Sequence, residues 1–243
     1  MPKTRIPILV TRADPGADET VSRLGDEGFS AIKTPVMHVV PDNTVTLPDL
    51  SDVSGLVFTS ANGVRAFVDR SDERAKMAWC VGPATATAAR DAGFFSVQES
   101  AGDARDLAAF IAERITPDKK PLLHIANAAA KGDLRAALEH AGHKVVFCPL
   151  YRMQRAESLD HDVINILNAK GPTIVLVHSE KGAESFVELL ENLPTDHLTS
   201  VAISERAAAP LRKAGLDTPH VADAPNEDGL FIALNRAVAI LSA

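Results

Sequence analysis

The same α/β pattern occurs twice in this chain, and this duplication constrains the fold more than any other feature. Residues 8–35 and 122–149 both contain an apolar strand, a polar loop, a helical segment, a glycine, a second strand and a proline. The glycines, Gly28 and Gly142, each precede that proline by seven residues. A glycine at the end of a helix in both copies indicates equivalent helix–strand connections.

A second pattern is also duplicated, and it follows the first pattern each time. Residues 56–63 and 175–182 both contain an apolar strand that ends near a serine, followed by a polar loop with a glycine. Residues 81–94 then align without gaps on residues 203–216. This order predicts two lobes, and we expect the working site in the cleft between them. The repeat alone leaves open which copies pair within one lobe.

The strands are short and apolar throughout, as expected of parallel sheets that are covered by helices on both faces. Helical segments alternate with them along the whole chain, which is typical of α/β layering. We therefore predict two open sheets of four or more parallel strands each. The clearest strands are 8–10, 55–58, 79–81, 122–125, 174–177 and 201–203.

Bulk properties exclude several classes of protein. The formal net charge of −7 and the lack of a basic stripe argue against a nucleic-acid partner. No apolar run reaches the length of a signal peptide core or a membrane span, so we expect a cytoplasmic protein without membrane contact. Cys80 and Cys148 lie in apolar runs and are expected to be reduced core thiols.

Familiar catalytic motifs are also missing from the sequence. No GxGxxG, Walker A or GxSxG pattern occurs, so a dinucleotide enzyme, a phosphate-loop enzyme and an α/β-hydrolase are not indicated. His140 and His143 flank a helix end without other candidate ligands, and we expect no metal site. His178 and Ser179 are adjacent on a strand end, where neighbouring side chains point apart, so a catalytic dyad is not expected there.

Ligands of open α/β sheets bind at the carboxyl ends of the strands, so the loops there are the candidate sites. Six such loops are rich in Ser, Thr, Asn and small residues that open onto helix N-termini. For any single loop, helix capping is the simpler interpretation. The six together favour a site for carboxylates or phosphates, since basic residues accompany them. These are Arg12, Arg65, Lys131, Lys181 and Arg206.

Tyr151 is the only tyrosine, and it stands where the chain leaves the second copy of the first pattern. Two interpretations are equally supported by its position. It is either an aromatic residue packed against a lobe or a phenol at the hinge that faces the cleft, since a phenol is amphipathic.

Taken together, these motifs resemble uroporphyrinogen-III synthase, and the resemblance runs from end to end. The matching segments are 9–12 (LVTR), 58–64 (FTSANGV), 81–86 (VGPATA), 149–152 (PLYR) and the later elements at Ser179 and Gly215. The resemblance implies two flavodoxin-like lobes joined by a two-stranded linker. Lobe 1 would comprise residues 1–36 plus 172–243 and lobe 2 residues 40–150, with linkers at 37–39 and 151–171.

The resemblance also implies an activity in tetrapyrrole and heme biosynthesis. The enzyme would be a lyase that closes hydroxymethylbilane into uroporphyrinogen III, with inversion of ring D and loss of water. It would need no metal and no organic cofactor. We expect a monomer whose partner is this small-molecule substrate, with transient contact to the preceding enzyme of the pathway. The eight carboxylates of the substrate suit loops that are lined with hydrogen-bond donors.

Residue roles follow from the same resemblance. Tyr151 would be catalytic and assist departure of the hydroxyl group from ring A, because a phenol with a pKa of about 10 is protonated near neutral pH. The substrate-binding residues would be Arg12, Ser60, Asn62, Thr85, Ser179, Lys181 and Arg206. Two departures weaken parts of this set: residues 204–207 read SERA where the family often has GPTT, and Asn127 replaces a commonly basic residue.

A different class of protein fits the duplication equally well. A non-catalytic two-lobed protein that closes on an anionic small molecule would show the same repeat and the same donor-rich loops. It would bind a carboxylated ligand tightly and form no product. A sugar- or nucleotide-processing α/β enzyme is a third class, but the chain lacks the phosphate loop of such enzymes.

Overall fold

The computed structural model describes residues 6–130, 132–216 and 219–242. The chain divides into two compact units, which are described one at a time. Unit 1 comprises Met1–His38 and Gln154–Ala243, and unit 2 comprises Val39–Met153. Within the described ranges, no helix combines the length and the apolar character that a membrane span requires.

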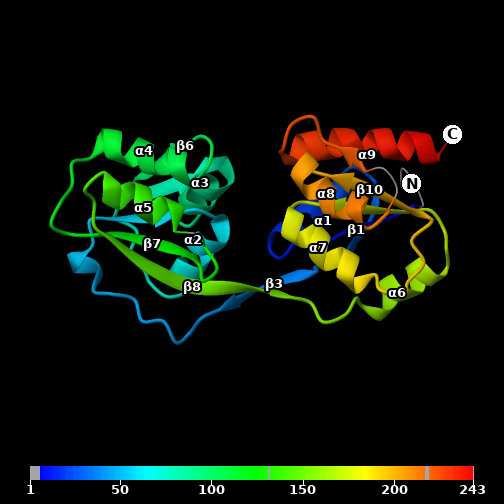
Figure 1. Cartoon of the computed structure of the whole chain (residues 1–243), viewed down its shortest axis with the longest axis horizontal. Coiled ribbons are helices and arrows are strands. Elements are labelled where there is room, and N and C mark those ends of the chain that lie inside the picture. Colours follow the sequence, from blue (N-terminus) through cyan, green and yellow to red (C-terminus); the bar gives the residue numbers. More distant parts are fainter. Residues whose placement is uncertain (1–5, 131, 217–218, 243) are drawn as a thin grey trace. The chain divides into compact units, whose positions relative to one another are not determined.

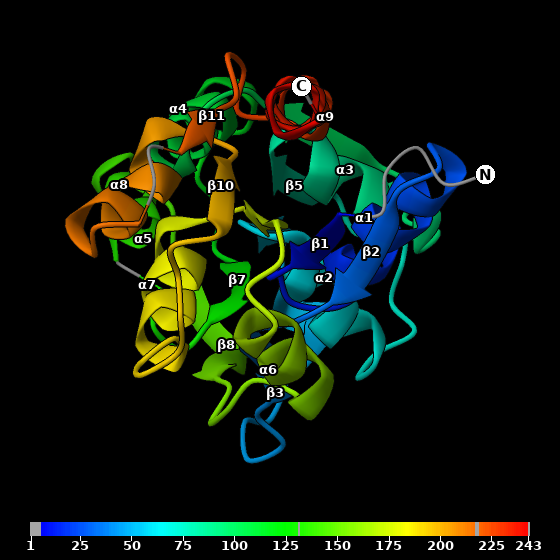
Figure 2. The same cartoon turned by 90° about the vertical axis from the view of Figure 1, so that its right-hand side faces the viewer.

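Unit 1 contains a five-stranded sheet that is assembled from both ends of the chain. Its order is β11-β10-β9-β1-β2, and the neighbouring strands are parallel. Figures 1 and 2 show the blue N-terminal strands in the same unit as the orange and red C-terminal elements. The strands are β1 (Pro7–Val10), β2 (Ser30–Lys33), β9 (Thr173–Val177), β10 (Leu198–Ala202) and β11 (His220–Val221).

Helices cover both faces of this sheet, because successive strand residues point to opposite sides. Leu9 and Val175 pack with α6, α7 and α8, whereas Ile8 and Ile174 pack with α1 and α9. The helices are α1 (Gly16–Asp26), α6 (His161–Asn168), α7 (Glu180–Leu189), α8 (Glu205–Lys213) and α9 (Glu227–Leu241). The core strand residues are fully buried, as in a three-layer α/β/α arrangement.

Unit 2 is a second three-layer arrangement around a six-stranded sheet of order β3-β8-β7-β4-β5-β6. Helices α2 and α3 pack on one face and α4 and α5 on the other. The strands are β3 (Met37–Pro41), β4 (Gly55–Phe58), β5 (Ala78–Val81), β6 (Val97–Ser100), β7 (Leu122–Asn127) and β8 (Val145–Arg155). The helices are α2 (Ala61–Val68), α3 (Gly82–Asp91), α4 (Ala104–Arg114), α5 (Asp133–His140) and a 3-10 turn at Leu50–Asp52.

Two neighbouring strands, β3 and β8, connect the units. Their pairing continues beyond the strand ends, since the Asp42 N–H donates to the Leu150 carbonyl at 2.8 Å and the Ala156 N–H to the Val36 carbonyl at 3.0 Å. The predicted fold class is confirmed: two lobes with parallel sheets are joined by two strands. Within the segment 151–171, which was expected to be linker, α6 buries Val163 and Leu167 in the core of unit 1.

The two cysteines are buried core thiols of unit 2. Burial raises the pKa of Cys80 to about 12 and that of Cys148 to about 11. Because the thiolate is the reactive form, neither residue is a nucleophile near neutral pH.

His124 is a buried base in the middle of β7, and it makes the stability of unit 2 depend on pH. Its side chain is 2% exposed, it packs edge-on against Phe147, and neither ring nitrogen has a hydrogen-bond partner among the described residues. Burial lowers the pKa of His124 from 6.5 to about 4. The unfolded chain therefore binds a proton more readily than the folded protein, and protonation favours unfolding.

We predict that protonation of His124 does not affect stability above pH 6.5. As the pH falls from 6.5 to 4, it should lower the free energy of unfolding by up to about 3 kcal/mol. Urea denaturation of the wild type and of His124→Leu across this range measures it, and the variant should show a shallower loss. Identical pH dependence of the two proteins would contradict the assignment to His124.

Candidate active site

The carboxyl edge of the unit 2 sheet brings together residues that are far apart in the sequence. Strand β4 pairs with β5 on one side and with β7 on the other, and β7 pairs with β8. The loops that follow these parallel strands therefore open on the same edge. Ser60 and Asn62 follow β4, Thr85 lies in the first turn of α3 after β5, and Tyr151 lies on β8 opposite Asn127.

Ser60 begins α2 as its N-cap. Its Oγ accepts a hydrogen bond from the Asn62 N–H at 3.2 Å, as capping predicts. The first turn of α2 lies directly against the end of β7, because a Cβ atom at Gly63 would stand 3.0 Å from the Ile125 carbonyl oxygen. The absence of a side chain at Gly63 thus permits close packing of α2 at the sheet edge.

Tyr151 lies against this helix start. Its side chain is 3% exposed, and its phenol forms a hydrogen bond with the Ser60 hydroxyl. Burial raises the pKa of the Tyr151 phenol above its usual value of 10, and the Ser60 hydrogen bond opposes that rise in part. The phenol is therefore protonated at neutral pH.

The two remaining candidates in unit 2 differ in their surroundings. Asn62 is half-buried and its Oδ1 accepts a hydrogen bond from Arg65 Nη1 at 3.3 Å. Thr85 is 5% exposed, and among the described residues no hydrogen bond joins it to Ser60 or Tyr151. The edge thus contains one connected pair, Ser60 with Tyr151, and two separate polar side chains.

Unit 1 has an equivalent edge at the ends of β1, β9 and β10. Ser179 is the N-cap of α7, with its Oγ accepting from the Gly182 N–H at 3.0 Å. Lys181 is exposed in the first turn of α7. Arg206, in the first turn of α8, is 79% exposed and donates from Nε to Glu180 at 2.7 Å. An exposed ion pair of this kind contributes little stability and leaves the guanidinium accessible.

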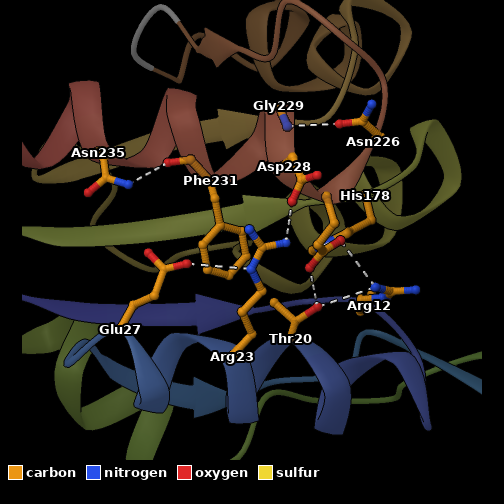
Figure 3. Close-up of polar contacts among 11 residues, drawn as sticks. Arg12, Thr20, Arg23, Glu27, His178, Asn226, Asp228, Gly229, Phe231 and Asn235 are labelled. Atoms are coloured by element: carbon orange, nitrogen blue, oxygen red, sulfur yellow. Dashed lines mark hydrogen bonds and ion pairs between the residues drawn. The ribbon is translucent and has the colours of Figure 1, made fainter.

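Arg12 is held in a polar cluster at the same edge (Figure 3). Its Nη1 donates to Thr20 Oγ1 at 3.2 Å and lies 3.4 Å from Glu227 Oε2, and Thr20 Oγ1 donates to Glu227 Oε1 at 2.7 Å. His178 Nε2 lies 3.5 Å from Glu227 Oε2. These residues come from the loop after β1, α1, the loop after β9 and the first turn of α9.

The electrostatics of this cluster leave one cation and one anion at neutral pH. Burial lowers the pKa of His178 despite the neighbouring carboxylate, so the imidazole is neutral. Burial alone would raise the pKa of Glu227, but His178, Thr20 and Arg12 together hold it at about 2. Arg12 therefore has a permanent counter-ion within the protein.

Sequence reasoning missed Thr20 and Glu227 and did not connect His178 with Arg12. Glu227 is 215 residues from Arg12, and it follows a helix N-cap, where acidic residues are common for reasons of helix stability. Thr20 lies within a helix and carries no motif. Only the proximity of α1 to α9 could have indicated their roles.

The comparisons with known proteins agree with this arrangement. The family model described as uroporphyrinogen-III synthase HemD matches residues 18–232. The chain is 26% identical over 223 residues to the porphyrin biosynthesis protein HemD of Ruminiclostridium josui. The match covers 86% of this chain and 44% of that protein, so the chain spans less than half the length of this relative.

Two solved structures share the fold. The uroporphyrinogen-III synthetase of Helicobacter pylori has a TM-score of 0.66 at 17% identity, over 97% of this chain and 99% of the other. A mutant uroporphyrinogen III synthase of Thermus thermophilus has a TM-score of 0.51 at 18% identity, over 96% and 99%. With a family model that matches most of its length, and the same two-lobed fold, this chain belongs to the uroporphyrinogen-III synthase family.

Proposed function

We propose that this protein is a lyase that closes hydroxymethylbilane into uroporphyrinogen III, with inversion of ring D and loss of one water. The observation that carries the proposal is the buried, protonated Tyr151 beside Ser60 at the carboxyl edge of the unit 2 sheet, in a chain of this family. A protonated phenol suits donation of a proton to a departing hydroxyl group.

In the proposed reaction, Tyr151 protonates the hydroxyl group of the ring A hydroxymethyl as the carbon–oxygen bond breaks. Water leaves, and the pyrrole nitrogen of ring A supplies electrons to the carbon, which gives an azafulvene. The substituted carbon of ring D bonds to this carbon and gives a spiro intermediate. The bond from the same ring D carbon to the methylene bridge of ring C then breaks, the bridge carbon bonds to the free carbon of ring D, and the proton released there returns to the Tyr151 phenolate. Attack at the free carbon instead gives the uninverted isomer, so orientation of the bound chain determines the product.

The polar edges supply the groups that would orient the chain. The backbone N–H groups of the first turns of α2, α7 and α8 are donors at positive helix ends, where carboxylates bind favourably. We assign Arg12, Ser60, Asn62, Thr85, Ser179, Lys181 and Arg206 to binding of substrate carboxylates. In this proposal Ser60 has two tasks, since its hydroxyl also orients Tyr151.

The identity of the product tests the function directly. Purified protein supplied with freshly made hydroxymethylbilane should yield mostly the type III isomer, whereas the uncatalysed closure gives type I. Chromatographic separation of the oxidised products distinguishes the isomers. Type I product alone, together with tight binding of the substrate, would support a binding protein and contradict the proposal.

Replacement of Tyr151 by Phe should lower turnover by about tenfold or more, which corresponds to about 1.4 kcal/mol in the barrier. The ring stays buried, so the unfolding free energy should change less than the rate. Steady-state rates and urea denaturation measure the two effects. Unchanged turnover in Tyr151→Phe would remove the acid role from this residue.

Two serines that cap helices offer a matched pair of variants. Ser60 caps α2 and Ser204 caps α8, and only Ser60 also contacts Tyr151. Ser60→Ala and Ser204→Ala should each lose about 1 kcal/mol of stability. Only Ser60→Ala should raise the pKa of Tyr151 further, because it removes the hydrogen bond that stabilises the phenolate.

The chain has a single tyrosine, so its phenolate absorbance reports Tyr151 alone. Ultraviolet titration of the two variants compares the phenol pKa, and the isomer assay compares turnover. Equal phenol pKa values in the two variants would show that Ser60 does not orient Tyr151.

A further inference from the structure

The guanidinium of Arg12 is folded back onto the start of α1 and does not extend freely from the loop. Its hydrogen bonds and ion pair with other described side chains all involve Nη1, which lies 3.2 Å from Thr20 Oγ1 and 3.4 Å from Glu227 Oε2. About a third of the Arg12 side chain, 32%, is exposed. The group is therefore fixed at one nitrogen while part of it stays accessible.

Gly16 provides the space for this conformation. A Cβ atom at Gly16 would come within 2.4 to 2.5 Å of Nε, Cζ and Nη2 of Arg12. Real Cβ atoms do not approach other atoms so closely, so any side chain here displaces the guanidinium. Gly16 has no positive φ, so its backbone conformation does not require glycine. Glycine is needed here because it has no side chain.

Glu227 connects all parts of the cluster. One carboxylate oxygen accepts from Thr20 of α1, and the other faces both Arg12 and His178. The next residue, Asp228, has a different partner: its Oδ1 lies 2.8 Å from Arg23 Nη1, and Arg23 in turn packs over the Phe231 ring (Figure 3). Asp228 therefore joins α9 to α1 without contact to Arg12.

We propose that Glu227 is a positioning residue that holds Arg12 in a fixed, accessible orientation for a carboxylate of the substrate. This inference rests on the proposed function, because it requires that Arg12 binds the substrate. A planar guanidinium fixed in advance loses less conformational entropy on binding than one on a mobile side chain. Glu227 also balances the charge of Arg12. The site would therefore bind a substrate carboxylate through directional hydrogen bonds and not through net positive charge.

The direction in which KM changes in Glu227→Ala distinguishes a positioning role from simple electrostatic repulsion of the substrate. Glu227→Ala removes a negative charge near a polyanionic substrate, and repulsion alone predicts that KM falls. Positioning predicts the opposite, because Arg12 regains its freedom. We expect KM to rise about fivefold, as for loss of one ordered charge-assisted hydrogen bond, while kcat changes by less than about twofold.

Asp228→Ala is the matched control. It removes the same charge from the same helix turn but leaves Arg12 in place, so KM should stay within about twofold of the wild type. Urea denaturation of both variants shows whether each is folded at the assay temperature. A merely structural effect of Glu227 would change stability without this difference in KM.

Gly16→Ala tests the same idea without altering any charged residue. Alanine is a better helix former than glycine, so the variant should fold. Its methyl group displaces the Arg12 guanidinium, and KM should rise as in Glu227→Ala. This second variant keeps the proposal testable even if Glu227→Ala does not fold.

A double substitution shows whether Glu227 acts through Arg12. In an Arg12→Ala background, Glu227→Ala should cause no further rise in KM. The proposal is overturned by a lower or unchanged KM in Glu227→Ala, by an unchanged KM in Gly16→Ala, or by additive effects in the double variant. Absence of type III product from the wild type contradicts the proposed function instead, so the two failures are distinct.

Discussion

The pairing of β1 with β9 is the interaction on which the rest of unit 1 depends. Both strands are buried on both faces, so each needs a hydrogen-bonded neighbour on either side within the sheet. One neighbour of β1 is β2, which is close in sequence. The other is β9, in which Ile174 pairs with Ile8, 166 residues away in the chain. Thr11 extends the contact, since its hydroxyl donates to the Leu176 carbonyl at 2.7 Å.

This pairing also assembles the polar cluster. Arg12 follows Thr11 directly, and His178 follows the last residue of β9, so the register of the two strands places both residues at one sheet edge. Helix α9 then packs on the same face as α1 and brings Glu227 to Arg12 and Thr20. A long-range backbone contact thus creates a site whose members carry no shared sequence motif.

Helix capping and function are not alternatives in this protein. Ser60, Ser179 and Ser204 cap α2, α7 and α8 in the same extended conformation, with φ of −162° in each case. Ser60 alone among these caps also forms a hydrogen bond with a phenol. A hydroxyl group can accept from the helix backbone and still take part in a second hydrogen bond, so a cap position can orient a neighbouring side chain.

The duplicated pattern in the sequence determined that this protein has two α/β units with parallel sheets. Apolar strands and glycine-ended helices are local signals, and they can be recognised without knowledge of the partner segments. The donor-rich loops after these strands were predictable for the same reason, because parallel strands place their carboxyl ends at one edge. The likeness of Ser60, Tyr151 and Ser179 to family positions added expected roles, which the sequence could not derive from spacing.

The residue pattern alone did not decide which strands share a sheet, which only the family resemblance indicated, and only the tertiary structure decided which side chains meet. The repeat permitted more than one pairing of its copies, because each strand is apolar on both faces and fits several neighbours. The partners of Arg12 and Tyr151 were likewise invisible in the sequence, since Glu227 reads as an ordinary acidic residue at a helix start and Ser60 as an ordinary cap. Contacts across a folded unit depend on distance in space, and no local pattern encodes that distance.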